Sequence, residues 1–264
     1  MRVEDKVAAV IGAGQTPGET IGNGRATALL LAREGARVML VDCRLESARE
    51  TQAMIEDEGG ECFAFEADVT READCRDLVA ACVERFGRLD LLHNNVGIGG
   101  GDAGPTRLDE SDWDQIMRVN LKSCFLTCKH ALPVMREQAG GSIVNISSVA
   151  AVCSVGIVAY KTSKAGMNAF THSLAIGNAR HGIRVNAIMP GLMDTPMAIE
   201  GISQARGIER AELVRQRDAA VPLGHKMGTA WDVAQAALFL HSDDARFITG
   251  VILPVDGGQS ARIG

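Results

Sequence analysis

Short β-branched runs alternate with longer Ala- and Leu-rich stretches along almost the whole chain, and this alternation is the strongest constraint on its fold. Strands are expected at residues 6–12, 37–42, 62–67 and 89–94. Helices are expected between them at residues 24–34, 45–58 and 71–86, with a glycine just beyond each. Repetition of strand and helix calls for right-handed parallel crossovers, so the chain is predicted to form an α/β fold with a doubly wound parallel sheet.

The second half of the chain continues this pattern. Further strands are expected at residues 142–147, 184–189 and 250–255. Further helices are expected from a cap at Ser111 or Asp112 to about Glu137, at residues 158–180, and at about 231–240. Residues 191–225 break the rhythm, and insertions of this length often serve as lids or binding loops. We therefore predict one domain over residues 1–264, with a substrate lid at about 197–225.

Composition excludes several classes of function. The 27 Lys and Arg against 33 Asp and Glu give a net charge of −6, which disfavours a nucleic-acid partner. No apolar run approaches the roughly 20 residues that cross a bilayer, and the N-terminal segment lacks the apolar core of a secretory signal, so no membrane association is expected. Seven cysteines without a Cys-x-x-Cys pair indicate reduced thiols in a cytoplasmic protein, and the six histidines lack metal-ligand spacing, so no metal site is expected.

Ligands of open parallel sheets lie beyond the carboxyl ends of the strands, so the residues there were considered first. The first strand is followed by a glycine-rich segment, residues 12–24, that leads into a helix. Such a turn lets the backbone approach a pyrophosphate, and the helix N-terminus supplies unpaired N–H groups. Asp42 ends the second strand, 18 residues after Gly24, near the spacing of an acid that binds an adenosine ribose. Taken singly, these features also fit a plain loop and a solvated strand end.

The next two strands also end in polar groups. Asp68 follows the third strand, and Asn94, Asn95, Val96 and Gly97 close the fourth. Polar groups at four successive strand ends favour a nucleotide site.

The single tyrosine, Tyr160, stands four residues before Lys164. On a helix these positions share a face, with Cβ atoms about 5–6 Å apart. A free tyrosine has a pKa of about 10, and a nearby ammonium, together with a cationic nicotinamide ring, lowers it. The pair therefore predicts a tuned proton donor and acceptor, although the same spacing also occurs on ordinary helix surfaces.

With these motifs in order, the chain resembles the short-chain dehydrogenase/reductase family from Lys6 to Ser260. The resemblance implies a Rossmann-like sheet of about seven strands with helices on both faces, and a nicotinamide-dependent oxidoreductase of alcohols and carbonyl compounds. The matching segments are the glycine turn, Asp68-Val69, Asn94-Asn95-Val96-Gly97, Val119-Asn120-Leu121, Ile143-Val144-Asn145-Ile146-Ser147-Ser148, Tyr160-x-x-x-Lys164, Arg184-Val185-Asn186-Ala187, Pro190-Gly191, Thr195-Pro196-Met197 and Val255-Asp256-Gly257-Gly258.

The resemblance also implies roles for individual residues. Tyr160 is the expected acid/base, Lys164 lowers its pKa and binds the nicotinamide ribose, and Asn120 anchors a water that relays protons. A serine after the fifth strand holds the substrate oxygen. The expected cofactor contacts are Gly12, Gly22, Asn23 and Gly24 at the pyrophosphate, Asp42 at the adenosine ribose, Asp68 and Val69 at the adenine, Asn94, Val96 and Gly97 beside the nicotinamide ribose, and Pro190, Gly191 and Thr195 at the nicotinamide amide.

The chain departs from the family pattern at three places. Nine residues separate Gly12 and Gly22, where the family usually has three, and we expect this longer loop to cap the adenosine half, with Glu19 repelling a 2′-phosphate. Ile11 replaces the usual threonine, which we interpret as core packing. The usual spacing of 13 residues before the tyrosine selects Ser147, whereas strand register selects Ser148, and we favour Ser148 because only one of them can face the substrate.

The predicted function is hydride transfer between NAD and a small secondary alcohol or ketone. NAD is preferred over NADP because the Asp42 carboxylate repels a phosphate, although Arg44 and Arg25 would soften that repulsion. Apolar lid residues, with Met193 and Val155, indicate a partly apolar substrate, and the resemblance implies a homotetramer.

Two other functions stay open. One is an NADPH-dependent 3-oxoacyl thioester reductase, because five basic residues near the expected pocket mouth would suit an acyl-carrier partner. The other is a non-catalytic dinucleotide sensor or structural subunit, which the complete catalytic set disfavours. The basic residues are Arg206, Arg210, Arg215, Arg217 and Lys226.

Overall fold

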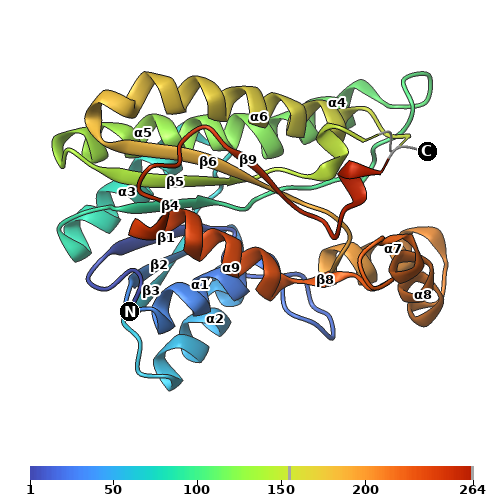
Figure 1. Cartoon of the computed structure of the whole chain (residues 1–264), viewed down its shortest axis with the longest axis horizontal. Coiled ribbons are helices and arrows are strands. Elements are labelled where there is room, and N and C mark those ends of the chain that lie inside the picture. Colours follow the sequence, from blue (N-terminus) through green and yellow to red (C-terminus); the bar gives the residue numbers. More distant parts are fainter. Residues whose placement is uncertain (154–155, 263–264) are drawn as a thin grey trace.

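A seven-stranded parallel sheet forms the centre of the computed structural model, which describes residues 1–153 and 156–262 (Figure 1). The strand order is β3-β2-β1-β4-β5-β6-β9, and every neighbouring pair is parallel. The strands are β1 (Val7–Ile11), β2 (Arg37–Asp42), β3 (Cys62–Glu66), β4 (Leu91–Asn94), β5 (Gly141–Ile146), β6 (Ile183–Pro190) and β9 (Ile252–Val255). A separate short pair joins β7 (Met193–Asp194) to β8 (Gly228–Thr229).

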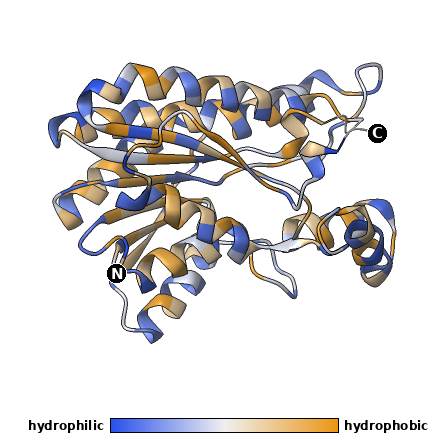
Figure 2. Ribbon diagram, in the orientation of Figure 1, coloured by the Kyte–Doolittle hydropathy of each residue, from blue (hydrophilic) through white to orange (hydrophobic). Residues whose placement is uncertain are grey.

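Helices cover both faces of the sheet, and the side chains of β1 explain why. Val7, Ala9 and Ile11 pack into one core and Ala8 and Val10 into the other, because successive residues of a strand point to opposite faces. The first core lies under α3 (Glu72–Phe86), α5 (Ser123–Glu137) and α6 (Ala159–Asn178), and the second under α1 (Asn23–Arg33), α2 (Leu45–Asp57) and α9 (Ala230–His241). Figure 2 shows apolar colouring concentrated along the strands between these layers.

The doubly wound sheet, the strand number and the two helical layers predicted from the sequence are confirmed, with element ends that differ by a few residues. The long helix predicted from Ser111 or Asp112 to Glu137 is present, but it begins at Glu110 and is not a regular α-helix throughout. Its first part, α4 (Glu110–Met117), has Asp109 as its N-cap residue without a side-chain capping bond, and a π-helical turn, η1 (Arg118–Lys122), joins it to α5. The turn accommodates the buried Asn120, whose side-chain amide forms hydrogen bonds with Ile98 and Ser163. Hydrophobic periodicity reports local structure only, so it does not predict a turn that depends on these long-range bonds.

Residues 191–225, which interrupted the sequence pattern, contain two helices. We call Pro196–Ala220 the α7–α8 segment, after α7 (Pro196–Arg206) and α8 (Arg210–Ala220). The segment lies beyond the carboxyl ends of the strands, at the right of Figure 1, and has a small apolar core of its own around Ile199, Val221 and Met227. No helix in the described part of the chain is both long and apolar enough to cross a membrane.

Candidate active site

The candidate site lies where the strand order reverses. After β1 the chain builds outward to β2 and β3 and then returns to β4 on the other side of β1, which leaves a crevice at the carboxyl ends of β1 and β4. Asn95 closes the bottom of this crevice by donating from Nδ2 to the carbonyl of Gly12 at 3.1 Å. A Cβ at Gly24 would lie 1.9 Å from the same carbonyl oxygen, so only glycine lets α1 begin this close to the loop.

The N-terminus of α1 has the features of an anion site. Its N-cap, Gly22, has no side chain to bond the first N–H groups, and the first turn contains no acidic residue. The unpaired N–H groups and the positive end of the helix dipole therefore face the crevice. These N–H groups fit the pyrophosphate of a dinucleotide. The neighbouring Asn23 has a buried Oδ1 atom without a partner among the described residues, and this acceptor oxygen would not itself bind a phosphate.

Asp42 lies at the edge of the glycine loop, as an acid for an adenosine ribose must. Its Oδ2 accepts from the N–H of Gly14 at 3.0 Å and its Oδ1 from the N–H of Arg44 at 3.0 Å. Arg25, which we expected to soften the charge of Asp42, instead donates to Glu50 at 2.7 Å and to Thr51 at 2.9 Å. That expectation for Arg25 is wrong, because the guanidinium is buried between α1 and α2.

The other residues expected around the nucleotide have different surroundings. Asp68 is exposed and its carboxylate accepts from the hydroxyl of Thr70 at 2.7 Å, while Val69 is buried in the core. Asn94 points into the protein, where its Nδ2 donates to Asn145 at 2.9 Å and its Oδ1 accepts from Thr127 at 2.8 Å. The side chain of Asn94 is thus held away from the crevice, and only its backbone borders it.

Three other expected cofactor residues follow β6. Pro190 ends that strand, Gly191 packs against Asp256 and Gln259, and Thr195 is the N-cap of α7. They line the crevice wall opposite the glycine loop, because β6 ends at the same edge of the sheet as β1.

The structure brings Tyr160, Ser148 and Lys164 together at the carboxyl end of β5. Tyr160 is in the first turn of α6, and a hydrogen bond from Ser148 reaches its hydroxyl. The Nζ of Lys164 lies 5.7 Å from the centre of the tyrosine ring and donates to the carbonyl of Ile146 at 2.7 Å. Gly97 makes room for this ammonium, since a Cβ there would lie 3.1 Å from Nζ.

The two candidate serines face opposite ways. The hydroxyl of Ser147 is buried and donates to the backbone carbonyl of Lys164 at 3.2 Å, on the inner side of α6. Ser148 is partly exposed beside Tyr160 and accepts from the N–H of Ala150 at 3.1 Å. Adjacent residues of an extended chain point to opposite sides, which is the reason for this division.

Burial governs the protonation of the pair. It raises the pKa of Tyr160 above its ordinary value, against the smaller lowering by the Ser148 hydrogen bond. It also lowers the pKa of Lys164 to about 8, because the ammonium loses its hydration. The sequence predicted a lowered pKa for Tyr160, and that direction is wrong for the protein alone, because desolvation by burial outweighs the lowering.

Asn120 connects these elements from the π-helical turn. Its Oδ1 accepts from the N–H of Ile98 at 2.7 Å, and its Nδ2 donates to the carbonyl of Ile98 at 2.9 Å and to Ser163 at 3.0 Å. Both donors of the amide are therefore used within the protein. The side chain fixes the segment after β4 against α6.

Sequence reasoning missed Asp102, which lies in the glycine-rich segment after β4. Its carboxylate accepts from the backbone N–H groups of Val158, Ala159 and Tyr160 at 3.1, 3.1 and 2.7 Å. The N-cap of α6, Val158, has no capping side chain of its own. That missing local cap was the one available sign that a residue from elsewhere caps α6.

The long loop after β1 contacts Asp42 through Gly14, and its far end contacts the α7–α8 segment. Arg210 of α8 pairs with Glu19 of the loop at 3.3 Å, with Glu200 of α7 at 3.3 Å and with Asp194 at 3.8 Å. The N–H of Glu19 also donates to Glu200 at 3.2 Å. Glu19, which we expected to repel a 2′-phosphate, instead pairs with Arg210 of α8, so that expectation for Glu19 is wrong.

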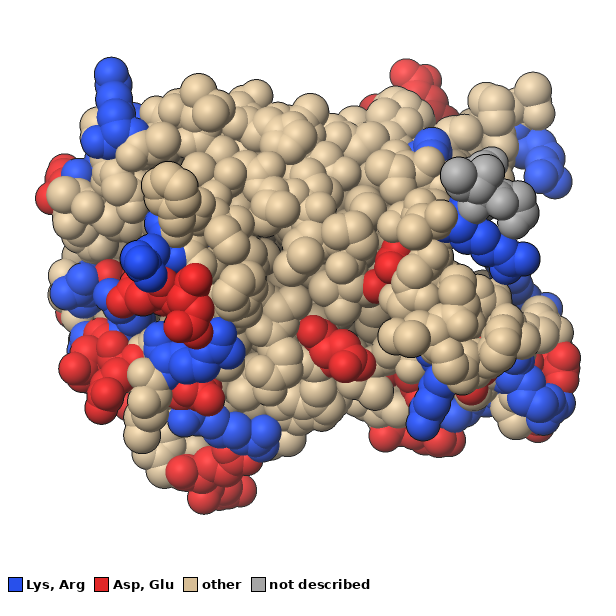
Figure 3. All heavy atoms as spheres, viewed as in Figure 1, with Lys and Arg blue, Asp and Glu red and all other residues tan. Residues whose placement is uncertain are grey.

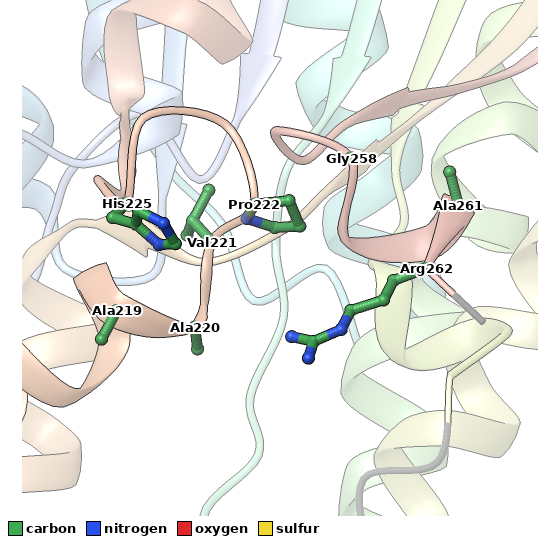
Figure 4. A pocket seen from close by; sticks show the side chains of 8 residues that line it. All are labelled: Ala219, Ala220, Val221, Pro222, His225, Gly258, Ala261 and Arg262. Atoms are coloured by element: carbon green, nitrogen blue, oxygen red, sulfur yellow. The ribbon is translucent and has the colours of Figure 1, made fainter. Parts of the chain in front are cut away.

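The α7–α8 segment uses most of its expected apolar surface internally. Ile199 and Leu213 are buried, and Met193 is buried in a separate apolar cluster with residues of β5, β6 and α9, while Met197 is half exposed; Val155 lies outside the described residues. A cavity of about 480 Å³ separates the end of α8 from the C-terminal segment, with the side chain of Arg262 pointing across it (Figure 4). Its lining residues are Ala219, Ala220, Val221, Pro222, His225, Gly258, Ala261 and Arg262.

The basic residues of α8 do not form a free cationic patch. Arg210 is shared by three carboxylates, Arg215 pairs with Glu212, and the partly buried Arg217 donates to the sulfur of Met227. Positive and negative side chains also interleave on the face shown in Figure 3. Among the described residues, no group of three or more His, Cys, Asp or Glu side chains is placed to hold a metal ion.

Fold and site together define an α/β oxidoreductase with a dinucleotide crevice beside a tyrosine and a lysine. A family model described as enoyl-(acyl carrier protein) reductase matches residues 19–260. Levodione reductase of Leifsonia aquatica is 35% identical to this protein over 98% of this chain and 96% of its own. A crystal structure of levodione reductase superposes on this chain with a TM-score of 0.93 at 34% identity, covering 99% of this chain and 100% of that one.

Two further relatives carry different names. A 3-oxoacyl-[acyl-carrier-protein] reductase of Thermotoga maritima is 38% identical over 98% of this chain and 99% of its own. Cyclohexanol dehydrogenase of an Acinetobacter strain is 34% identical over 99% of this chain and 97% of its own. The chain belongs to the short-chain dehydrogenase/reductase family and is an NAD(P)-dependent oxidoreductase of alcohols or ketones.

Proposed function

We propose that this protein is an NAD-dependent dehydrogenase that interconverts a small secondary alcohol and its ketone. The observation that carries the proposal is the meeting of Tyr160, Ser148 and Lys164 beside the glycine-loop crevice. Such a group is needed to move a proton on and off an alcohol oxygen. Relatives named for levodione and cyclohexanol support a cyclic or otherwise compact substrate.

The preference for NAD rests on Asp42 and its surroundings. Its carboxylate lies beside Gly14 and can accept from two ribose hydroxyls, but it repels a 2′-phosphate. Arg25 is bound to Glu50, so its guanidinium is not free to attract that phosphate, whereas the exposed Arg44 donates to the carbonyl of Gln15 and keeps a charge that would soften the repulsion. The other proposed contacts follow the family pattern: Gly12, Gly22, Asn23 and Gly24 at the pyrophosphate, Asp68 and Val69 at the adenine, Asn94, Val96 and Gly97 at the ribose, and Pro190, Gly191 and Thr195 at the amide.

The bound nicotinamide supplies the chemistry of accepting or donating a hydride at the carbinol carbon. Tyr160 takes the hydroxyl proton in the oxidative direction and returns it in the reductive one. Ser148 donates to the substrate oxygen, which carries growing negative charge during oxidation, and thereby stabilises it. Lys164 places a positive charge one helical turn from the phenol and favours its ionised form.

Replacing Tyr160 with phenylalanine tests this function. The change removes one oxygen atom, so NAD binding should persist while turnover falls by about 10²–10⁴-fold. The assay is reduced-nicotinamide absorbance in a screen of secondary alcohols and ketones with NAD and with NADP. Full-rate oxidation by Tyr160→Phe contradicts the proposal. Cofactor binding by the wild type with no turnover of any compound in the screen favours a dinucleotide sensor instead.

The second candidate function is an NADPH-dependent 3-oxoacyl thioester reductase, which the Thermotoga maritima relative and the description of the family model favour. The engagement of Arg210, Arg215 and Arg217 within the protein weakens it, because an acyl-carrier partner is acidic and needs free cations. The exposed Arg206 and Lys226 keep it as an alternative. Reduction of a 3-oxoacyl thioester with NADPH at a rate above that of simple ketones would select this alternative.

We also propose that the α7–α8 segment, which covers most of residues 197–225, is a substrate lid. We further propose that the protein is a cytoplasmic homotetramer. The position of the segment beyond the strand ends supports the lid, with Met197 as its exposed apolar contact. Among the described residues all seven cysteines are free thiols, which suits a reducing compartment. Phe247, 99% exposed, and the half-exposed Phe125 supply apolar surface for contacts between subunits. Light scattering after size-exclusion chromatography measures the subunit number.

A further inference from the structure

Tyr160 is only the second residue of α6, so its position depends on the first turn of this helix. The first N–H groups of a helix have no partner within the helix, and helix ends open at low cost in free energy. In α6 the first bond along the helix runs from the N–H of Thr162 to the carbonyl of Val158 at 3.0 Å. The backbone of Tyr160 therefore depends on a partner from outside the helix.

Asp102 is that partner, although it lies more than fifty positions earlier in the chain. One oxygen of its carboxylate accepts from Val158 and Ala159, both at 3.1 Å, and the other accepts from Tyr160 at 2.7 Å. Three consecutive donors thus converge on one partly buried carboxylate. Its negative charge also faces the positive end of the α6 dipole, which strengthens all three bonds.

Lys164 does not depend on this contact. It lies one turn deeper in α6, and its ammonium is anchored to the Ile146 carbonyl at 2.7 Å. Asp42 and the glycine loop belong to the other half of the sheet. Loss of the Asp102 carboxylate should therefore release Tyr160 and leave the groups that hold the cofactor in place.

We propose that Asp102 is the positioning residue of the active site, which holds the first turn of α6 closed so that the Tyr160 hydroxyl stays beside Ser148. The proposal rests on the proposed role of Tyr160 as acid/base. It extends that role by tying the tyrosine to the loop after β4, which borders the same crevice. The charged groups that face this turn are Asp102 from the loop and Lys161 and Lys164 from α6 itself.

The test exploits the fact that Tyr160 is the only tyrosine in the chain. The phenolate absorbance of the cofactor-free protein is titrated with pH for the wild type, Asp102→Ala and Asp102→Asn, with Tyr160→Phe as the blank. Burial raises the pKa of the wild-type phenol. In Asp102→Ala the turn opens and solvates the phenol, so its titration should move down toward the ordinary value of about 10. Asp102→Asn keeps one acceptor oxygen and should titrate closer to the wild type.

Kinetics of the same variants provide the second readout. Because a displacement of about 1 Å can cost about 100-fold, Asp102→Ala should lower kcat by about 10- to 100-fold with the dissociation constant for NAD within about twofold of wild type. Asp102→Asn should recover most of this loss. Asp109→Ala is the matched control, since Asp109 is an exposed aspartate at the N-cap of α4 that makes no side-chain capping bond, and it should leave both readouts unchanged.

Three results would overturn the proposal. The first is that Asp102→Ala shows the same phenol titration and the same kcat as the Asp109→Ala control. The second is that Asp102→Ala loses NAD affinity in parallel with kcat. The third is that Asp102→Ala and Asp102→Asn lose kcat to the same extent. If Asp102→Ala does not fold, the asparagine variant decides, since a kcat at the level of Tyr160→Phe would exclude rescue by a single acceptor. Absence of turnover in the wild type would count against the proposed function, and the titration would still test Asp102.

Discussion

Exchange of Ser148 and of Ser147 for alanine, one at a time, separates two neighbouring hydroxyls that differ only in the side they face. Ser148 bonds the hydroxyl of Tyr160, and Ser147 bonds the backbone carbonyl of Lys164. We expect Ser148→Ala to lose activity and Ser147→Ala to keep most of it, while each change lowers stability to a small extent, because Ser148 also accepts from the N–H of Ala150.

The magnitudes follow from the bonds that each change removes. Loss of one donor to a developing oxyanion costs about 10²–10³-fold in kcat, or about 2.7–4 kcal/mol, which is the expectation for Ser148→Ala. Loss of the buried bond from Ser147 at 3.2 Å removes about 0.5–1.5 kcal/mol from the free energy of unfolding and leaves kcat within about threefold.

The pH dependence of Ser148→Ala supplies an independent check. The Ser148 hydrogen bond lowers the pKa of Tyr160, so its removal raises that pKa further. Alcohol oxidation needs the phenolate, and the rising limb of kcat/KM against pH should therefore move to higher pH. Initial rates from reduced-nicotinamide absorbance and chemical unfolding curves measure both variants. A larger loss of turnover in Ser147→Ala than in Ser148→Ala would refute the assignment.

Four further changes test three other parts of the structure. Asp42→Ala should lower the ratio of kcat/KM for NAD to that for NADP by about 10-fold or more, because charge-assisted bonds to the ribose are worth about 1.5–3 kcal/mol; an unaltered ratio contradicts this role. Arg210→Gln should raise the NAD dissociation constant by at most about fivefold, since exposed pairs such as that with Glu19 contribute about 0–1 kcal/mol. Deletion of residues 16–20 should raise this dissociation constant further. If calorimetric titration finds no change in the deletion variant, the loop does not take part in cofactor binding. Burial lowers the pKa of His93 to about 3, so the unfolded chain binds the extra proton first and stability should fall as pH drops below about 6.5, by about 1.4 kcal/mol per unit; thermal unfolding of His93→Leu should show a shallower slope, and an equal slope would exclude His93 as a cause.

The fold could be predicted from the sequence because each element carries a local signal. The buried strand β1 is a continuous apolar run, and glycines follow the first three helices, so the order of strands and helices could be predicted. The π-helical turn before α5 could not be predicted, because it depends on the hydrogen bonds between Asn120 and Ile98 of another segment.

The candidate site was predicted in outline and corrected in orientation. The glycine loop, Asp42 and the Tyr160–Lys164 spacing are local patterns, and the structure gathers them at one edge of the sheet. Asn94 belongs to the same motifs, yet its side chain points inward to Asn145 and Thr127. A motif names the residue type at a position but does not state which side of the chain faces the ligand.

By itself the sequence determined the α/β class, the order of strands and helices along the chain and the residue types at the strand ends, since these depend on patterns within a few positions. The tertiary structure decided that Ser148 faces Tyr160, that Glu19 reaches Arg210 across the crevice, and that Asp102 caps α6. Each of these depends on where two distant segments meet. Such meetings follow from the packing of helices and loops onto the sheet, which no short stretch of sequence encodes.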